Sequence, residues 1–197
     1  IAAPQLEGGP FERAVILMVH HDEEGAMGFI INKAVDIDFG SLLESADQPL
    51  AIPVSESSYG KTVFFGGPVR VEQLWAIFQR QGEGAGASTA KSVEPVGDLE
   101  AISRLDFHPD WALASSSSII ESLAAGERPG DYLPIIGYAG WGAGQLESEI
   151  EEGSWLAIDF EADLLVDTPP ADRWEAALDT IGLDPASFLM MGQGGRA

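Results

Sequence analysis

Short apolar runs between glycine- and proline-containing turns dominate the chain, and this pattern predicts strands more often than helices. Residues 13–19 and 26–32 form two such runs around a turn that ends at Gly25, which predicts a β-hairpin. Further strands are expected in five other runs, at 62–65, 111–114, 131–138, 155–160 and 163–166.

Four segments have the spacing of helices: 39–46, a segment that begins at Ser118, 145–152 and 168–181. Ser118 and Glu121 fit a capping box, which predicts that Ser118 caps its helix. Residues 69–79 fit a helix or a strand equally well. Because hairpins come first and helices follow irregularly, the pattern favours a mixed α+β fold over a strictly alternating one. We expect a single domain over residues 1–197.

Composition narrows the classes of protein further. The chain has 197 residues, 45% of them apolar, and no cysteine, which excludes disulfides, thiolate zinc sites and thiol nucleophiles. Its longest clean apolar run, 14–19, is far shorter than the roughly 20 residues that span a bilayer. We see no signal peptide and expect a cytoplasmic protein. The first residue is Ile1, which leaves a processed start or absent N-terminal residues as alternatives.

The net charge of −22 comes from 32 acidic and ten basic residues, and the basic residues are scattered singly. Proteins that bind nucleic acids draw much of their affinity from clustered Lys and Arg. We therefore expect no direct nucleic-acid contact and no binding to anionic membranes. Solubility is the simplest meaning of the acidity.

The hairpin edge carries His20, His21 and Asp22, a set that suggests a metal ligand group or a general base. Neighbouring strand residues point to opposite faces, so both histidines do not reach one site easily. No HExxH spacing and no G-x-S-x-G elbow is present. We predict no metal site, no catalytic set and no cofactor, and structural roles for these histidines.

The richest stretch runs from Gly137 to Gln145, where a strand leads into a glycine-rich turn and then a helix. Such a turn brings free N–H groups near a ligand and attracts anions. The stretch matches neither the dinucleotide fingerprint nor the Walker A motif. The alternative is that the glycines serve close packing around Tyr138 and Trp141.

Three other sites in the sequence contain polar residues or glycines that could serve either ligand binding or the fold. Arg173, beside Trp174, suits a carboxylate or phosphate clamp, or an ordinary ion pair. Asn32 belongs either to a site or simply to a strand end. Gly66 and Gly67 precede Pro68 in what is by default a sharp turn.

Together these motifs resemble the AlgH/YqgE family. The resemblance rests on the order and spacing of 25–33, 65–69, 137–147, 155–156 and 172–174, and it covers nearly the whole chain. It implies a bacterial cytosolic protein with a bifurcated or barrel-like, largely antiparallel sheet surrounded by helices. The family carries the label of transcriptional regulator, which the charge limits to an indirect role. Many relatives have Cys-Glu-His where this chain has Val19, His20 and His21, so a thiol-based role is absent here.

The leading hypothesis is a non-catalytic regulatory or ligand-binding module for a small anionic ligand or a protein partner. Its candidate ligand residues are His21, Asn32, Gly66, Gly67, Gly137, Tyr138, Gly140, Trp141, Gln145 and Arg173. The alternatives are an unrecognised enzyme that uses His21 as a base, an indirect transcriptional regulator, and a protein–protein adaptor.

Overall fold

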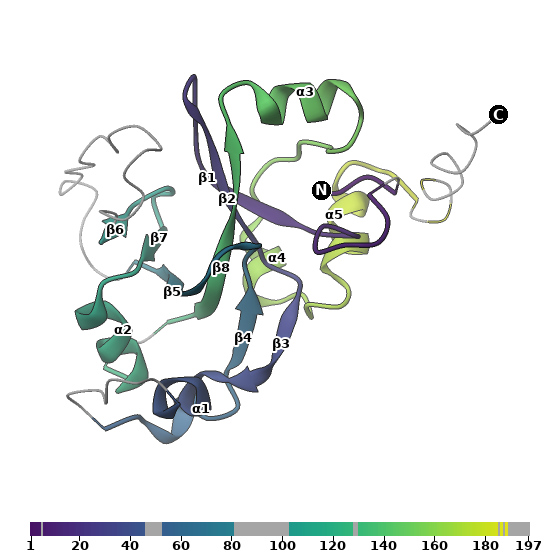
Figure 1. Ribbon diagram of the computed structural model, residues 1–197. Helices are drawn as coiled ribbons and strands as arrows, with labels where there is room; N and C mark the ends of the chain where they lie inside the picture. Colours follow the sequence, from purple (N-terminus) through teal and green to yellow (C-terminus); the bar gives the residue numbers. More distant parts are fainter. Residues whose placement is uncertain are drawn as a thin grey trace. The chain divides into compact units, whose positions relative to one another are not determined.

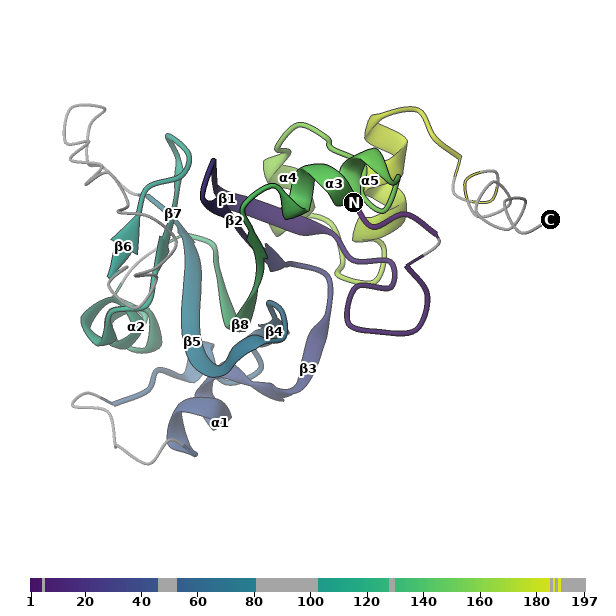
Figure 2. The same cartoon turned by 45° about the horizontal axis from the view of Figure 1, so that its top comes forward.

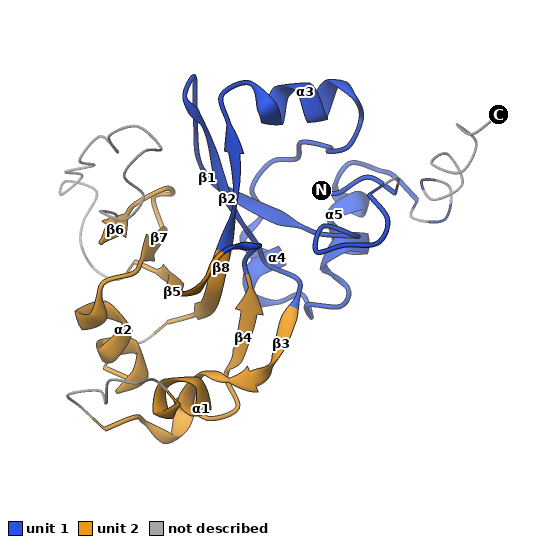
Figure 3. Ribbon diagram, viewed as in Figure 1, with its two compact units in different colours: residues 1–33, 66–69, 138–197 blue, residues 34–65, 70–137 orange. Residues whose placement is uncertain are grey.

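The chain divides into two compact units, which interleave along the sequence (Figure 3). Unit 1 holds residues 1–33, 66–69 and 138–197, and unit 2 holds 34–65 and 70–137. These units come from a computed structural model that describes residues 1–4, 6–45, 53–80, 103–127, 130–184, 186 and 188. The sequence also predicts a flexible, glycine-rich tip at 81–87 and a loose tail at 192–197, and both lie outside the described residues. The single domain over 1–197 stays a prediction.

The predicted hairpin is confirmed in unit 1. Strands β1 (Ile16–Asp22) and β2 (Gly25–Ile30) pair antiparallel from Ile16 opposite Ile30 to Asp22 opposite Gly25, with a register shift between Met18 and His20. The side chains of Ile16 and Met18 lie over Gly28, where a Cβ atom would come within 2.6 Å of Ile16 Cγ2 and 2.9 Å of Met18 Sδ. These two side chains therefore share one face of β1.

Strand β8 (Tyr132–Gly142) belongs to both units, and its last residues pair antiparallel with β2. In unit 1 the strand order is thus β1-β2-β8. β8 leads directly into the turn before helix α3 (Gln145–Glu151), as Figures 1 and 2 show. Helices α4 (Ala162–Val166) and α5 (Arg173–Thr180) complete the unit.

Two of the predicted strands in unit 1 are wrong. The segment 163–166 is part of helix α4, because an apolar run this short fits either structure. In the segment 155–160 only Trp155 forms a bridge, to Ala2, and the following residues run without strand pairing. Helix α5 also begins later than expected, after both prolines at 169–170.

Unit 2 resolves the ambiguous segment as strand β5 (Val69–Gln79), whose first residue belongs to unit 1. The other elements of unit 2 are β3 (Ala34–Asp38), α1 (Phe39–Glu44), the 3-10 helix η1 (Glu56–Ser58), β4 (Thr62–Phe65), β6 (Arg104–Leu105), β7 (Trp111–Ala114) and α2 (Ser117–Ala124). The predicted capping box is wrong, since α2 begins one residue before Ser118 and its N-cap is Ser116.

The sheet branches at β8. One path runs through β5 and β7 to β6, and the other through β4 to β3. Strand β4 pairs with β8 in parallel, with Phe64 opposite Ile135. The pairs β1–β2, β2–β8, β3–β4, β5–β7 and β6–β7 are antiparallel. The predicted mixed α+β fold with a bifurcated, largely antiparallel sheet is confirmed.

Each unit buries its own apolar residues. In unit 2, Phe39, Leu43, Val63 and Phe78 pack with α2 in one apolar cluster. Asp38 caps helix α1 by accepting a hydrogen bond from the Ser41 N–H at 2.9 Å. In unit 1 the largest fully buried side chains are those of Met27, Phe29, Ile30, Leu165 and Trp174.

Candidate functional site

The glycine-rich stretch completes β8 and forms the turn into α3. Gly137 and Gly144 have φ angles of +67° and +70°, a conformation that favours glycine. A Cβ atom on Gly140 would come within 3.3 Å of the Tyr138 ring. Gln145 Oε1 accepts the Gly142 N–H at 3.0 Å, so this amide already has a partner within the protein. These glycines serve the path of the backbone and the packing beside it.

The Glu149 carboxylate on α3 accepts hydrogen bonds from two tryptophans that lie outside the helix in unit 1. Glu149 Oε2 accepts the indole N–H of Trp141 at 2.9 Å and that of Trp155 at 2.7 Å. Its Oε1 accepts the Gln145 amide at 2.8 Å. The two indole rings meet edge to face, with centroids 5.9 Å apart. Glu149 thereby ties α3 to the end of β8 and to the segment that follows the helix.

The charge of Glu149 is set by two opposing effects. Burial raises its pKa, whereas hydrogen bonds from Trp155, Gln145 and Trp141 lower it by more. The net result is a pKa below the usual 4.5, so the carboxylate is ionised at neutral pH. An ionised acceptor strengthens all three hydrogen bonds.

The two histidines have different partners, as strand alternation predicted. His21 Nε2 lies 2.5 Å from Glu147 Oε1 on α3, and both side chains are about half exposed, at 49% each. The hydrogen bond from His21 is the main reason why the pKa of Glu147 is lowered. His20 instead pairs with Asp22 at 2.9 Å. His21 thus links β1 to α3 at the surface of unit 1.

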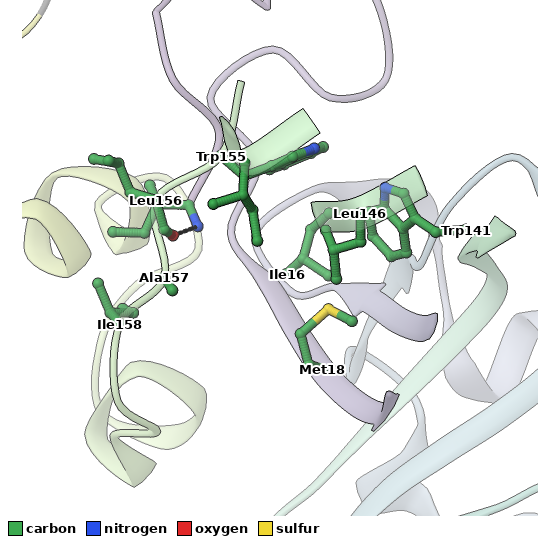
Figure 4. Close-up of a pocket in the computed structure, with 10 residues that line it drawn as sticks. Ile16, Met18, Trp141, Leu146, Trp155, Leu156, Ala157 and Ile158 are labelled. Atoms are coloured by element: carbon green, nitrogen blue, oxygen red, sulfur yellow. Dashed lines mark hydrogen bonds between the residues drawn. The ribbon is translucent and has the colours of Figure 1, made fainter. Parts of the chain in front are cut away.

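An apolar groove lies beside β1, within unit 1. It consists of two adjoining cavities of about 130 and 230 Å³ that share Ile1, Ile16, Met18 and Ile158, and we call it the β1 groove. Figure 4 shows Ile16 and Met18 on one side, with Leu156, Ala157 and Ile158 on the other.

The two cavities differ in their further lining. The first adds Trp141, Leu146, Ile150 and Trp155, which are all apolar or aromatic. The second adds aliphatic residues, Phe160 and the two acids Asp159 and Glu161. Met18 and Ile150 are 36% and 41% exposed, which is high for large apolar side chains.

Metal ligation finds no support in the part of the chain that the structure describes, where no three His, Asp or Glu side chains gather closely enough to hold an ion. None of the described helices is long and apolar enough to cross a membrane.

Comparison with known proteins identifies the family. The model of the AlgH-like family (DUF179) matches residues 1–186. The chain belongs to the AlgH-like family. A UPF0301 protein of Bordetella petrii is 37% identical over 198 residues, covering 100% of this chain and 87% of its relative. A UPF0301 protein of Vibrio parahaemolyticus is 34% identical and covers 95% and 92%.

Solved structures carry the same fold as this AlgH-like chain. The solution structure of the AlgH protein from Pseudomonas aeruginosa is 28% identical, has a TM-score of 0.71, and covers 100% of this chain and 93% of that one. The crystal structure of a Corynebacterium diphtheriae protein has a TM-score of 0.64 at 18% identity, with 98% and 88% covered, which shows the fold alone.

Several family motifs of this AlgH-like protein serve its fold. Asn32 accepts the Val15 N–H at 2.9 Å and donates to the Arg13 carbonyl at 2.8 Å. Gly66 accepts the Ile30 N–H at 2.8 Å. Gly67 lies so close to the Tyr138 backbone that a Cβ atom would come within 2.3 Å of it, at a φ of +151°.

Arg173 is buried, with 4% of its surface exposed. Its guanidinium donates to the backbone carbonyls of Ile31, Leu165 and Thr168. Burial lowers the pKa of Arg173 to about 10, which still leaves it charged at neutral pH. The guanidinium that could have clamped an anion therefore holds α5 against the rest of unit 1.

Of the predicted ligand residues, the structure gathers Trp141 and Gln145 around Glu149, and only Trp141 also lines the β1 groove. Sequence reasoning missed Glu149 and the groove residues Ile16 and Met18. The i, i+2 spacing of the two apolar residues showed that they share a face of a strand. Nothing in the sequence showed that this face borders a cavity.

Proposed function

We propose that the protein is a non-catalytic binding module whose β1 groove takes an apolar occupant. One observation carries the proposal, namely that two apolar cavities adjoin along β1 and share four residues. Each cavity is smaller than a typical pocket for a drug-sized ligand, so the occupant is narrow and elongated. Filling such a site removes apolar surface from water, which favours binding by about 25 cal/mol per Å².

The chemistry of the groove opposes an anionic occupant. Asp159 and Glu161 are the acidic residues among those that line the second cavity, and the whole chain carries a net charge of −22. A neutral or positively charged group therefore suits this cavity better than a carboxylate or phosphate. The predicted anionic ligand depended on free N–H groups in the 137–145 turn and on Arg173, but the Gly142 N–H and the Arg173 guanidinium both bond within the protein.

A binding role also accounts for His21 better than general-base catalysis. His21 pairs with Glu147 and is not among the residues that line either cavity. A regulatory role, direct or through a protein partner, would follow from occupancy of the groove and requires no contact with DNA.

Binding of the neutral, solvatochromic dye Nile red tests the proposal. Met18→Glu places a carboxylate on the groove wall, and Ile181→Glu is the matched control, because Ile181 is 42% exposed in the same unit and lines neither cavity. We expect Met18→Glu to weaken binding at least about tenfold, corresponding to 1.4 kcal/mol, and the control to leave it unchanged. Equal dye binding by both variants and the parent chain would refute the site.

Charge preference gives a second test of the same groove. Dodecylamine and dodecanoate share their chain length and differ in the sign of the end group. The proposal requires dodecylamine to bind more tightly and Asp159→Asn to reduce the difference. A preference for dodecanoate would contradict it.

A further inference from the structure

The sulfur of Met18 lies on the wall of the β1 groove. The chain has no cysteine, and of its four methionines the structure describes Met18 and Met27. Met18 is 36% exposed, whereas Met27, on the neighbouring strand β2, is 0% exposed. Within the described residues, Met18 is therefore the sulfur-containing side chain that dissolved reagents reach directly.

The packing around Gly28 holds this sulfur at a defined place. Met18 Sδ lies 2.9 Å from the position that a Cβ atom on Gly28 would occupy, and Ile16 Cγ2 lies 2.6 Å from the same position. The thioether thus packs over a glycine, beside the Ile16 side chain (Figure 4). Because Met18 lines both cavities of the groove, an occupant of either cavity contacts its side chain.

A thioether that is open to solvent reacts with peroxides. A lone pair on sulfur attacks one oxygen of hydrogen peroxide, so that an S–O bond forms and the O–O bond breaks. The proton on the transferred oxygen passes to the departing hydroxide, which leaves as water. Sulfur is oxidised by two electrons and the peroxide is reduced by the same two. The product is methionine sulfoxide, which methionine sulfoxide reductases return to the thioether.

A sulfoxide oxygen at Met18 changes the wall that both cavities share. In the reduced chain this shared wall consists of four apolar side chains, those of Ile1, Ile16, Met18 and Ile158. The S=O group is a hydrogen-bond acceptor that water satisfies in the open groove. An apolar occupant would displace this water and offer no donor in exchange, so binding becomes less favourable. The reaction alters no backbone group of the β1–β2 pair.

We propose that Met18 is a redox-sensitive modification site, and that its oxidation by hydrogen peroxide closes the β1 groove to an apolar occupant. The inference rests on the proposed function, because it names how binding in the same groove is regulated. The coupling acts in both directions. An occupant that covers Met18 slows its oxidation, and the sulfoxide weakens the binding of the occupant.

Peroxide oxidation of the full chain, followed by mass spectrometry of its peptides, tests the site. Met27 is the internal control, because it is a methionine of the same unit with no exposed surface. We expect Met18 to oxidise at least about tenfold faster than Met27 in the folded chain, and the two rates to converge in concentrated urea. Equal rates in the folded chain would overturn the assignment of the site.

Nile red binding, measured before peroxide treatment and after removal of the peroxide, tests the effect on the groove. Met18→Leu lacks the thioether in the groove, and the double variant Met190→Leu, Met191→Leu lacks the two methionines outside the described residues. Each chain is compared only with itself. We expect peroxide to weaken binding at least about tenfold in the parent and in the double variant, and to have no effect in Met18→Leu. Methionine sulfoxide reductases should restore binding in the parent.

The outcomes separate this inference from the proposed function. An equal loss of binding in Met18→Leu, or unchanged binding after complete oxidation of Met18, would overturn the regulation while the apolar site stands. Oxidation of Met18 that saturating Nile red fails to slow would overturn the coupling. If the reduced chain binds no dye, the proposed function fails and the regulation fails with it, whereas the ratio of the Met18 and Met27 oxidation rates still decides the modification site.

Discussion

Replacing Arg173 with methionine measures how much one buried cation contributes to unit 1. The guanidinium donates to Thr168 O at 3.0 Å, to Leu165 O at 2.7 Å and to Ile31 O, so it joins α4, α5 and the end of β2. Methionine fills a similar volume but donates no hydrogen bond. The substitution therefore leaves three carbonyls without this donor while keeping most of the packing.

The expected loss follows from the cost of a buried acceptor. Each carbonyl left without a partner costs about 1–3 kcal/mol, and such costs add incompletely because water and neighbouring groups compensate. We expect Arg173→Met to lower the free energy of unfolding by about 3–5 kcal/mol. With a urea slope of about 2 kcal/mol per molar, the unfolding midpoint falls by about 1.5–2.5 M.

Urea unfolding followed by tryptophan fluorescence is the assay, and two variants serve as references. Arg13→Met removes an exposed guanidinium 5.4 Å from the Trp174 ring, a cation–π contact worth about 0.5–1 kcal/mol. Arg173→Lys keeps the charge but has no planar fork, so its midpoint should lie between those of the parent and Arg173→Met. If Arg173→Met is no less stable than Arg13→Met, the structural role of Arg173 is refuted.

Four other substitutions separate residues of the fold from residues of a site. Gly67→Ala forces a Cβ atom into the Tyr138 backbone and should prevent recovery of folded protein, whereas Gly144→Ala, at a left-handed φ of +70° with open space around it, should lose only about 1–2 kcal/mol in thermal unfolding. Glu149→Gln should be less stable than the parent at neutral pH, and urea titrations should show the difference shrinking as the pH falls below 4.5, because a lowered folded pKa gives stability that is lost on protonation. Asn32→Asp keeps the acceptor for the Val15 N–H and loses the donor to Arg13, so it should cost about 1–2 kcal/mol in urea without changing Nile red affinity.

Local patterns were enough to predict most of the elements. The apolar runs and the glycine turn predicted β1 and β2, and the helical spacing over 145–152 predicted α3. They failed where the deciding contact is distant in sequence. The segment 155–160 has the composition of a strand, but only Trp155 finds a bridging partner, and that partner is Ala2.

The candidate site was harder to predict for the same reason. Arg173 and Asn32 are polar residues of the kind that bind ligands, and sequence alone does not reveal that their partners are backbone carbonyls and amides of the same chain. The glycines of the 137–145 stretch were open to two interpretations, and the close approach at Gly140 favours packing. The groove has no polar motif, so no search for chemistry-bearing residues could find it.

The contrast between these two sets of residues indicates where binding can evolve in this protein. Polar groups such as Glu149 and Arg173 each hold several elements of unit 1 together, so altering them costs stability before it changes any ligand. The β1 groove is different, because Met18 on its wall is already partly exposed and makes no hydrogen bond through its side chain that would be lost. Substitutions there change the occupant at little cost to the fold, which is the property expected of a binding surface.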